Sequence, residues 1–119
     1  MGRIGVGIIS FGLGLSGIAT GGAQAITLKD WQGLSEGFRS GYAWGIAESL
    51  VYFSNSEEDQ ALSAGYRKCF KEKSMNTQAA LGLVEAYLQR TPDAAGAPMA
   101  ANVLRAYIEL CKEHIGTPG

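Results

Sequence analysis

The chain has 119 residues and a formal net charge of −1 at pH 7, which suits one domain and excludes the broad basic surface typical of nucleic-acid-binding proteins. It contains three prolines, two cysteines and one histidine, so few residues are available for metal or acid–base chemistry. Alanine, leucine, glutamate and lysine dominate the second half, and this composition favours an all-α domain.

Residues 1–25 carry one basic side chain, Arg3, followed by an uncharged, glycine-rich run that ends in Ala23-Gln24-Ala25. A short positive region, an apolar stretch and a small-x-small ending are typical of a secretory signal peptide. We therefore expect residues 1–25 to be a signal peptide that is cleaved before Ile26. The expected mature protein, residues 26–119, is then an exported single helical domain.

Two other interpretations of the leader are weaker. The run is long enough for a membrane anchor, but glycine and serine dilute its hydropathy and no charged residue closes it before Lys29, so no stable anchor is expected. Residues 12–17, GLGLSG, match the GxGxxG fingerprint of dinucleotide-binding proteins. That fingerprint requires a βαβ unit, which this sequence does not supply, so no cofactor is expected.

The segment from Trp31 to Phe53 has glycine at every fourth position from 33 to 45. Thr27-Leu28-Lys29-Asp30 before it resembles a capping box and predicts one long helix over about 28–53. Each glycine inside a helix costs about 0.5–1 kcal/mol relative to alanine, so a compensating contact is expected. The predicted helix-packing face contains Phe38, Gly41, Tyr42 and Gly45, with a neighbouring helix close to the two glycines.

Capping residues and apolar spacing predict three further helices. An acidic first turn after Ser56 starts a helix over about 57–70, and the polar run before Thr77 starts another over about 77–90. Pro98 suits the first position of a last helix over about 98–114. The predicted fold is a compact all-α bundle of about four helices.

The two cysteines, Cys69 and Cys111, are expected to form a disulfide, because export places them in an oxidising compartment. In the chain-entropy model this bond contributes about 4 kcal/mol. The alternative is a metal site built from Cys69, Cys111 and His114, but structural zinc usually needs a fourth ligand. We therefore expect no metal.

Catalysis is poorly supported by the sequence. His114 is the only imidazole, and a cation in the last turn of a helix complements the helix dipole. No motif surrounds a serine or cysteine nucleophile, so the protein is not expected to be an enzyme. The densest charge is Glu57, Glu58 and Asp59, which either form a solvated helix start or contact a basic partner surface.

Several of these features occur together in a known family. They are Phe38-x-x-Gly41-Tyr42-x-x-Gly45, then Cys69, Thr77-Gln78, Tyr87-Leu88-x-x-x-Pro92-Asp93, and Ala106-Tyr107 leading into Cys111. In this pattern the chain resembles the Rap/Tai immunity proteins, which neutralise peptidoglycan amidases delivered by bacterial type VI secretion. The match extends over essentially the whole mature region.

The resemblance implies an all-helical periplasmic protein with one disulfide that binds its cognate amidase effector and occludes the enzyme's active-site groove. Members of this family are often dimeric, so a homodimer is a second association to consider. The alternatives are an acid-stress chaperone of the HdeA-like type and another small periplasmic binding protein. The chaperone would also be small and helical, with a single disulfide.

Overall fold

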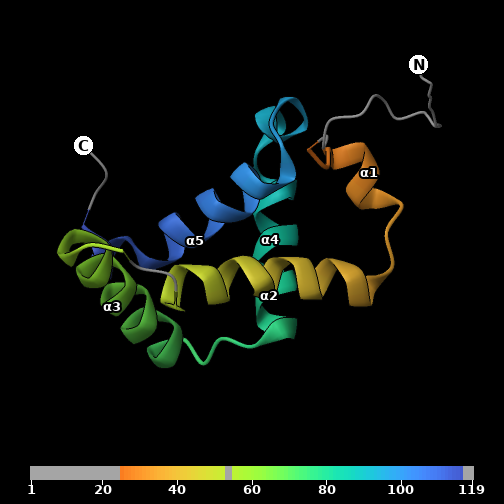
Figure 1. Ribbon diagram of the computed structural model, residues 1–119. Helices are drawn as coiled ribbons and strands as arrows, with labels where there is room; N and C mark the ends of the chain where they lie inside the picture. The colour runs from red at the N-terminus through yellow and green to blue at the C-terminus, as the bar shows by residue number, and fades with distance from the viewer. Residues whose placement is uncertain (1–24, 53–54, 117–119) are drawn as a thin grey trace, which may run out of the picture.

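The computed structural model describes residues 25–52 and 55–116, and every regular element within them is helical (Figure 1). The all-α prediction is confirmed. Of the expected signal peptide only Ala25 lies within the described residues. The elements are α1 (Leu28–Gln32), α2 (Glu36–Tyr52), α3 (Glu57–Glu72), α4 (Thr77–Gln89), the 3-10 turn η1 (Pro92–Gly96) and α5 (Met99–Ile115).

The helices begin at side chains that accept hydrogen bonds from the first turn. The Thr27 hydroxyl accepts from the Asp30 amide at 3.1 Å, and the Asp30 carboxylate accepts from the Thr27 amide at 3.0 Å, which confirms the capping box. Ser56 caps α3 in the same way, and Asn76 caps α4. These local bonds explain why the predicted starts at 57 and 77 agree with the structure.

The prediction of one helix over 28–53 is wrong, because the helix is interrupted at residues Gly33 to Ser35. Gly33 ends α1: its amide donates to the Asp30 carbonyl, and the Leu34 amide donates to the Trp31 carbonyl, both at 3.1 Å. The Ser35 hydroxyl then accepts from the Phe38 amide at 3.1 Å and starts α2. The break turns α1 back on the molecule, so that the Trp31 side chain is buried with 1% of its surface exposed.

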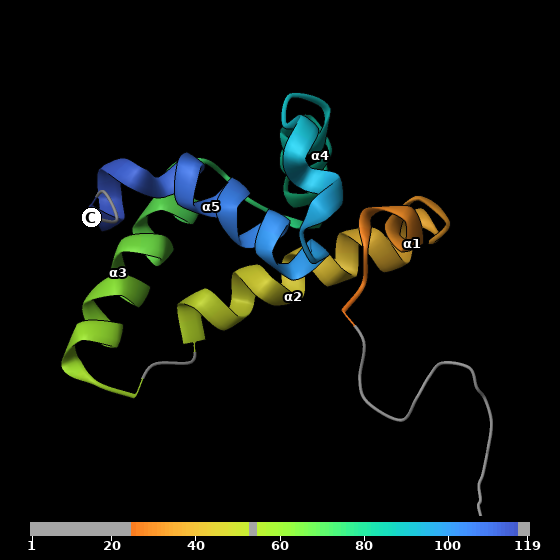
Figure 2. The same ribbon diagram turned by 90° about the horizontal axis from the view of Figure 1, so that it is seen from above.

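Helix α2 is at the centre of the fold. It contacts α3, α4 and α5, and both views place α1 and α3 near its opposite ends (Figures 1 and 2). The buried Tyr107 hydroxyl of α5 donates to the Ala43 carbonyl of α2 at 2.6 Å. The core is formed by buried side chains from all five α-helices: Trp31, Ala43, Ala47, Tyr66, Cys69, Phe70, Ala80, Val84, Met99, Val103, Tyr107 and Cys111.

The predicted role of the α2 glycines is also wrong. Gly41 and Gly45 are exposed, and a Cβ atom built on either would meet nothing within 4 Å. Phe38 is 51% exposed, whereas Tyr42 is half-buried and packs against the core. The buried side of α2 carries Ala43 and Ala47, each about 200° around the helix from the glycine two residues before it. Alanine therefore permits the close contact without the entropic cost of glycine.

The close glycine contact lies instead between α3 and α5. A Cβ atom built on Gly65 would lie 2.5 Å from the His114 carbonyl oxygen and 3.2 Å from the Ile115 side chain. Gly65 precedes Cys69 by one helical turn, so the glycine and the cysteine lie on the same side of α3. None of the helices in the described ranges is long and apolar enough to cross a membrane.

Candidate partner-binding surface

The disulfide between Cys69 and Cys111 joins α3 to α5, with a Cα–Cα distance of 5.5 Å. The predicted pairing is confirmed. Because both sulfurs are bonded to each other, they cannot act as thiolate ligands, and the alternative metal site loses two of its three proposed ligands. Within residues 25–52 and 55–116 no group of three or more potential ligands is arranged to hold a metal ion.

His114 lies close to the disulfide, where its side chain links the same two helices. Its Nε2 atom is 2.9 Å from a carboxylate oxygen of Glu72 on α3. The hydrogen bond from His114 lowers the pKa of Glu72 below its ordinary value of 4.5. His114 therefore has a structural partner in addition to the favourable dipole position that the sequence predicts.

The acidic turn, Glu57 to Asp59, forms the exposed first turn of α3. None of its three carboxylates forms an ion pair with a residue that the structure describes. Their position stabilises the helix N-terminus, as expected for acidic side chains in a first turn. Because they are exposed, the carboxylates are also accessible to a partner.

The structure brings the acidic turn together with residues from α5 that the sequence does not connect to it. Glu58 and Asp59 line a shallow hollow whose other walls include Leu62, His114 and Ile115. Leu62 is 42% exposed, which is high for a large apolar side chain. Charged residues around an accessible apolar side chain are the usual arrangement of a protein interface, with its polar rim and apolar centre.

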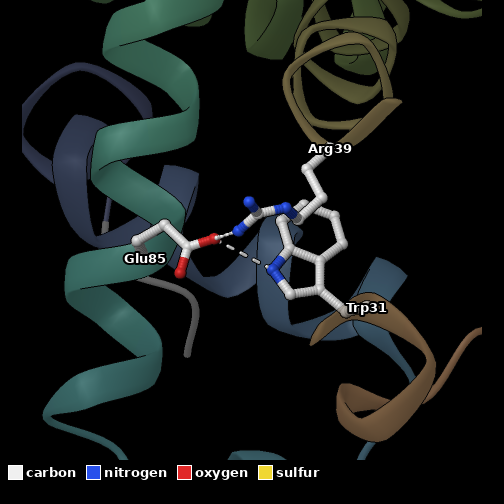
Figure 3. A network of polar contacts seen from close by, with 3 residues as sticks. All are labelled: Trp31, Arg39 and Glu85. Carbon is white, nitrogen blue, oxygen red and sulfur yellow. Dashed lines mark hydrogen bonds and ion pairs between the residues drawn. The ribbon is translucent and has the colours of Figure 1, made fainter. Parts of the chain in front are cut away.

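A polar network holds α1 on the body of the fold (Figure 3). One oxygen of Glu85 on α4 accepts hydrogen bonds from the indole N–H of Trp31 at 3.0 Å and from the guanidinium of Arg39 at 2.7 Å. The network therefore joins α1, α2 and α4. It could not be found from local sequence, because Glu85 lies 54 and 46 positions from its two donors.

A second concave feature, the α2–α3 groove, lies between the C-terminal halves of these two helices and has a volume of about 220 Å³. Its lining combines apolar and aromatic side chains with three charged ones. The lining residues are Trp44, Ala47, Glu48, Val51, Tyr52, Arg67, Phe70, Lys71 and Met75. Local sequence does not predict this groove, because its walls come from separate helices and its shape depends on how they cross.

No family model, curated protein or solved structure matches this chain. Its function must therefore be inferred from its own residues and geometry. The structure is a disulfide-linked helical domain with two accessible concave surfaces. One is the acidic hollow, lined by Glu58, Asp59, Leu62, His114 and Ile115, and the other is the α2–α3 groove.

Proposed function

We propose that the protein acts in the periplasm as an immunity protein of the Rap/Tai type, which binds and inhibits a peptidoglycan amidase effector of type VI secretion. The observation that carries the proposal is the Cys69–Cys111 disulfide within an all-helical domain. Structural disulfides persist in oxidising compartments, and the periplasm is where such amidases act. An amidase is proposed as the partner because the sequence motifs resemble those of this family.

The acidic hollow is the proposed contact surface for the effector. Its carboxylates, Glu58 and Asp59, and the adjacent Glu57 suit a basic patch on the enzyme, and the neighbouring Leu62 suits an apolar contact. The disulfide holds α3 and α5 together beside this surface. A surface that is already ordered loses less entropy on binding, which favours high affinity.

The test is co-expression of the full chain with an amidase effector encoded beside its gene and directed to the periplasm. Expected results are rescue from lysis, copurification, and affinity at the nanomolar level or better, about −12 kcal/mol or more favourable. A chain without residues 1–25 is the control, and it should not rescue the cells. Continued lysis with folded protein in the periplasm would reject the proposal. Suppression of client aggregation at low pH would then support the acid-stress chaperone.

The contact surface is tested separately by Glu57→Gln, Glu58→Gln and Asp59→Asn in one variant. We expect binding to weaken by about tenfold, mostly through slower association, and the difference to shrink at high salt. Asp93→Asn, at an exposed position in η1, is a single-charge control outside the acidic turn and should bind like the unmodified protein. Equal affinity for all three proteins would exclude the acidic turn from the interface.

Processing provides an independent prediction. Because Ala23-Gln24-Ala25 ends the uncharged leader, exported protein is expected to begin at Ile26. Intact mass and amino-terminal sequencing of protein expressed with its own leader measure this. A membrane fraction that contains the uncleaved chain would instead support the anchored form.

A further inference from the structure

The α2–α3 groove has a chemistry that the proposed function does not use. Trp44, Val51 and Tyr52 form its α2 wall, and Phe70 and Met75 lie on the other side. Tyr52 is 71% exposed and presents a large aromatic surface with a polar hydroxyl, a type of side chain that is enriched at interfaces. The Tyr52 ring is therefore accessible beside the groove, whereas Trp44 is half-buried and Phe70 is buried.

The cations of α3 are concentrated on the same half of the helix as the groove. Its first turn carries three carboxylates, whereas residues 67–73 carry four cations, Arg67, Lys68, Lys71 and Lys73, and one carboxylate, Glu72. Glu72 is already paired with His114 on α5. Two of the cations, Arg67 and Lys71, line the groove itself, facing a single carboxylate, Glu48.

Arg67 is held in place at the groove. Its guanidinium donates one hydrogen bond to the Val51 carbonyl near the end of α2, at 3.0 Å. A guanidinium has five N–H donors, so this bond leaves donor capacity for an incoming carboxylate. Basic residues in the last turns of a helix also complement its dipole, but this effect does not account for the exposed Tyr52 ring beside them.

We propose that the α2–α3 groove docks an acidic segment of a protein partner, with a large apolar side chain of that segment inserted among Trp44, Tyr52 and Met75. The carboxylates of the segment pair with Arg67 and Lys71 at the rim. The groove lies near the C-terminal end of α3, and the acidic hollow lies near its N-terminal end. Because the groove carries cations where the hollow carries carboxylates, it would bind a partner of the opposite charge. This inference goes beyond the proposed function, because it does not require the partner to be an amidase.

The test is a titration of the mature, disulfide-bonded protein, labelled with ¹⁵N, with short synthetic peptides. The acidic probe is acetyl-Glu-Asp-Phe-Leu-Glu-Asp-amide. The two comparison peptides replace its acidic residues by lysine, or its Phe-Leu pair by serine. We expect the indole N–H resonance of Trp44 to shift with the acidic probe, while that of the buried Trp31 stays unchanged and serves as the internal control.

Variants at exposed positions locate the binding. Lys71→Glu and Tyr52→Ala are each expected to weaken binding of the acidic probe by about fivefold or more. Lys29→Glu on α1 and Phe38→Ala at the other end of α2 are the matched charge and aromatic controls, and each should change it by less than about twofold. All four proteins are first checked for unchanged helical circular dichroism.

The proposal is overturned if the acidic probe does not bind, or if the lysine peptide binds equally well. Equal binding of the serine peptide, or of a short oligothymidylate, would mean that the cations form a general polyanion surface, and this also contradicts it. Because the titration contains no amidase, failure here leaves the immunity proposal intact. Failure of the lysis assay likewise leaves the peptide result intact.

Discussion

At the scale of single residues, small residues are buried where the helices pack. Ala43 and Ala47 are buried on α2, and Gly65 on α3 leaves no room for a methyl group. Protein interiors are packed as densely as organic crystals, so a single added atom at such a position displaces its neighbours. The exposed glycines of α2 have no such constraint.

Gly65→Ala is therefore expected to destabilise the protein by about 1–3 kcal/mol, because its Cβ would lie 2.5 Å from a backbone carbonyl of α5. Gly45→Ala, with nothing within 4 Å, should stabilise it by about 0.5–1 kcal/mol through helix propensity. Urea denaturation of both variants measures the difference. The same sign of change in both would refute this account of the contact.

At the scale of elements, α1 is too short to be stable alone and depends on its attachment. Burial of Trp31 and the Glu85 network hold it against α2 and α4. The Met99 amide at the start of α5 also donates to the Ile26 carbonyl just before α1, at 2.7 Å. The orientation of α1 therefore depends on contacts distant in sequence.

Glu85→Ala is expected to cost about 1–3 kcal/mol, because it leaves the buried indole N–H and the half-buried guanidinium without their acceptor. Glu109→Ala is the matched control. It removes an ion pair between two half-exposed side chains, Arg90 and Glu109, and should cost less than about 1 kcal/mol. Equal unfolding free energies for the two variants would mean that the Glu85 network does not stabilise α1.

The pairing of α3 with α5 is expected to depend on pH through Glu72. Its pKa is lowered in the folded state by the hydrogen bond from His114, so this pair stabilises the fold above the ordinary value of 4.5 and the effect disappears as the pH falls. Glu72→Gln should lower the thermal midpoint near neutral pH and flatten its decline in acid.

Glu113→Gln, at an exposed position beside His114, is the control and should follow the unmodified protein. The measurement is the thermal midpoint across the acid range. Identical acid dependence in the Glu72 and Glu113 variants would contradict the assignment.

At the scale of the whole molecule, the disulfide is the main covalent constraint on the fold. It joins positions 42 residues apart, so the unfolded chain loses much of its freedom when the bond is present. The double variant Cys69→Ala/Cys111→Ala should lose about 2–4 kcal/mol in urea denaturation. Reductant should lower the stability of the unmodified protein and not that of the variant. If reduction has no effect, the entropic account fails.

The sequence predicted the parts of this structure that depend on local chemistry. The helix starts at Glu57 and Thr77 follow from caps one residue away, and the disulfide follows from the expected compartment and only two cysteines. The sequence does not predict the break after Gly33, because the four-residue glycine period continues from 33 to 45 past the cap at Ser35. The rotation of α2 about its axis decides which small residues are buried, so the glycine pattern predicts the wrong packing face for this helix.

The candidate surfaces were predicted only where their residues are adjacent in sequence. The exposed acidic turn was identified, because its three carboxylates are consecutive. Its hollow and the α2–α3 groove were not, since each combines two helices whose crossing no local pattern specifies. Glu58 on α3 and Ile115 on α5, for example, line the same hollow because α3 and α5 pack closely at Gly65.

The solvent-facing glycines of α2 have a consequence for the order of folding. Compared with three alanines, Gly37, Gly41 and Gly45 together make the free energy of forming helix α2 less favourable by about 1.5–3 kcal/mol. No contact at these glycines offsets this cost. Helix α2, which contacts α3, α4 and α5, is thus poorly able to form on its own. We expect α2 to become helical late, on a template of α4 and α5, and its amides to exchange with solvent through local openings more readily than those of α5.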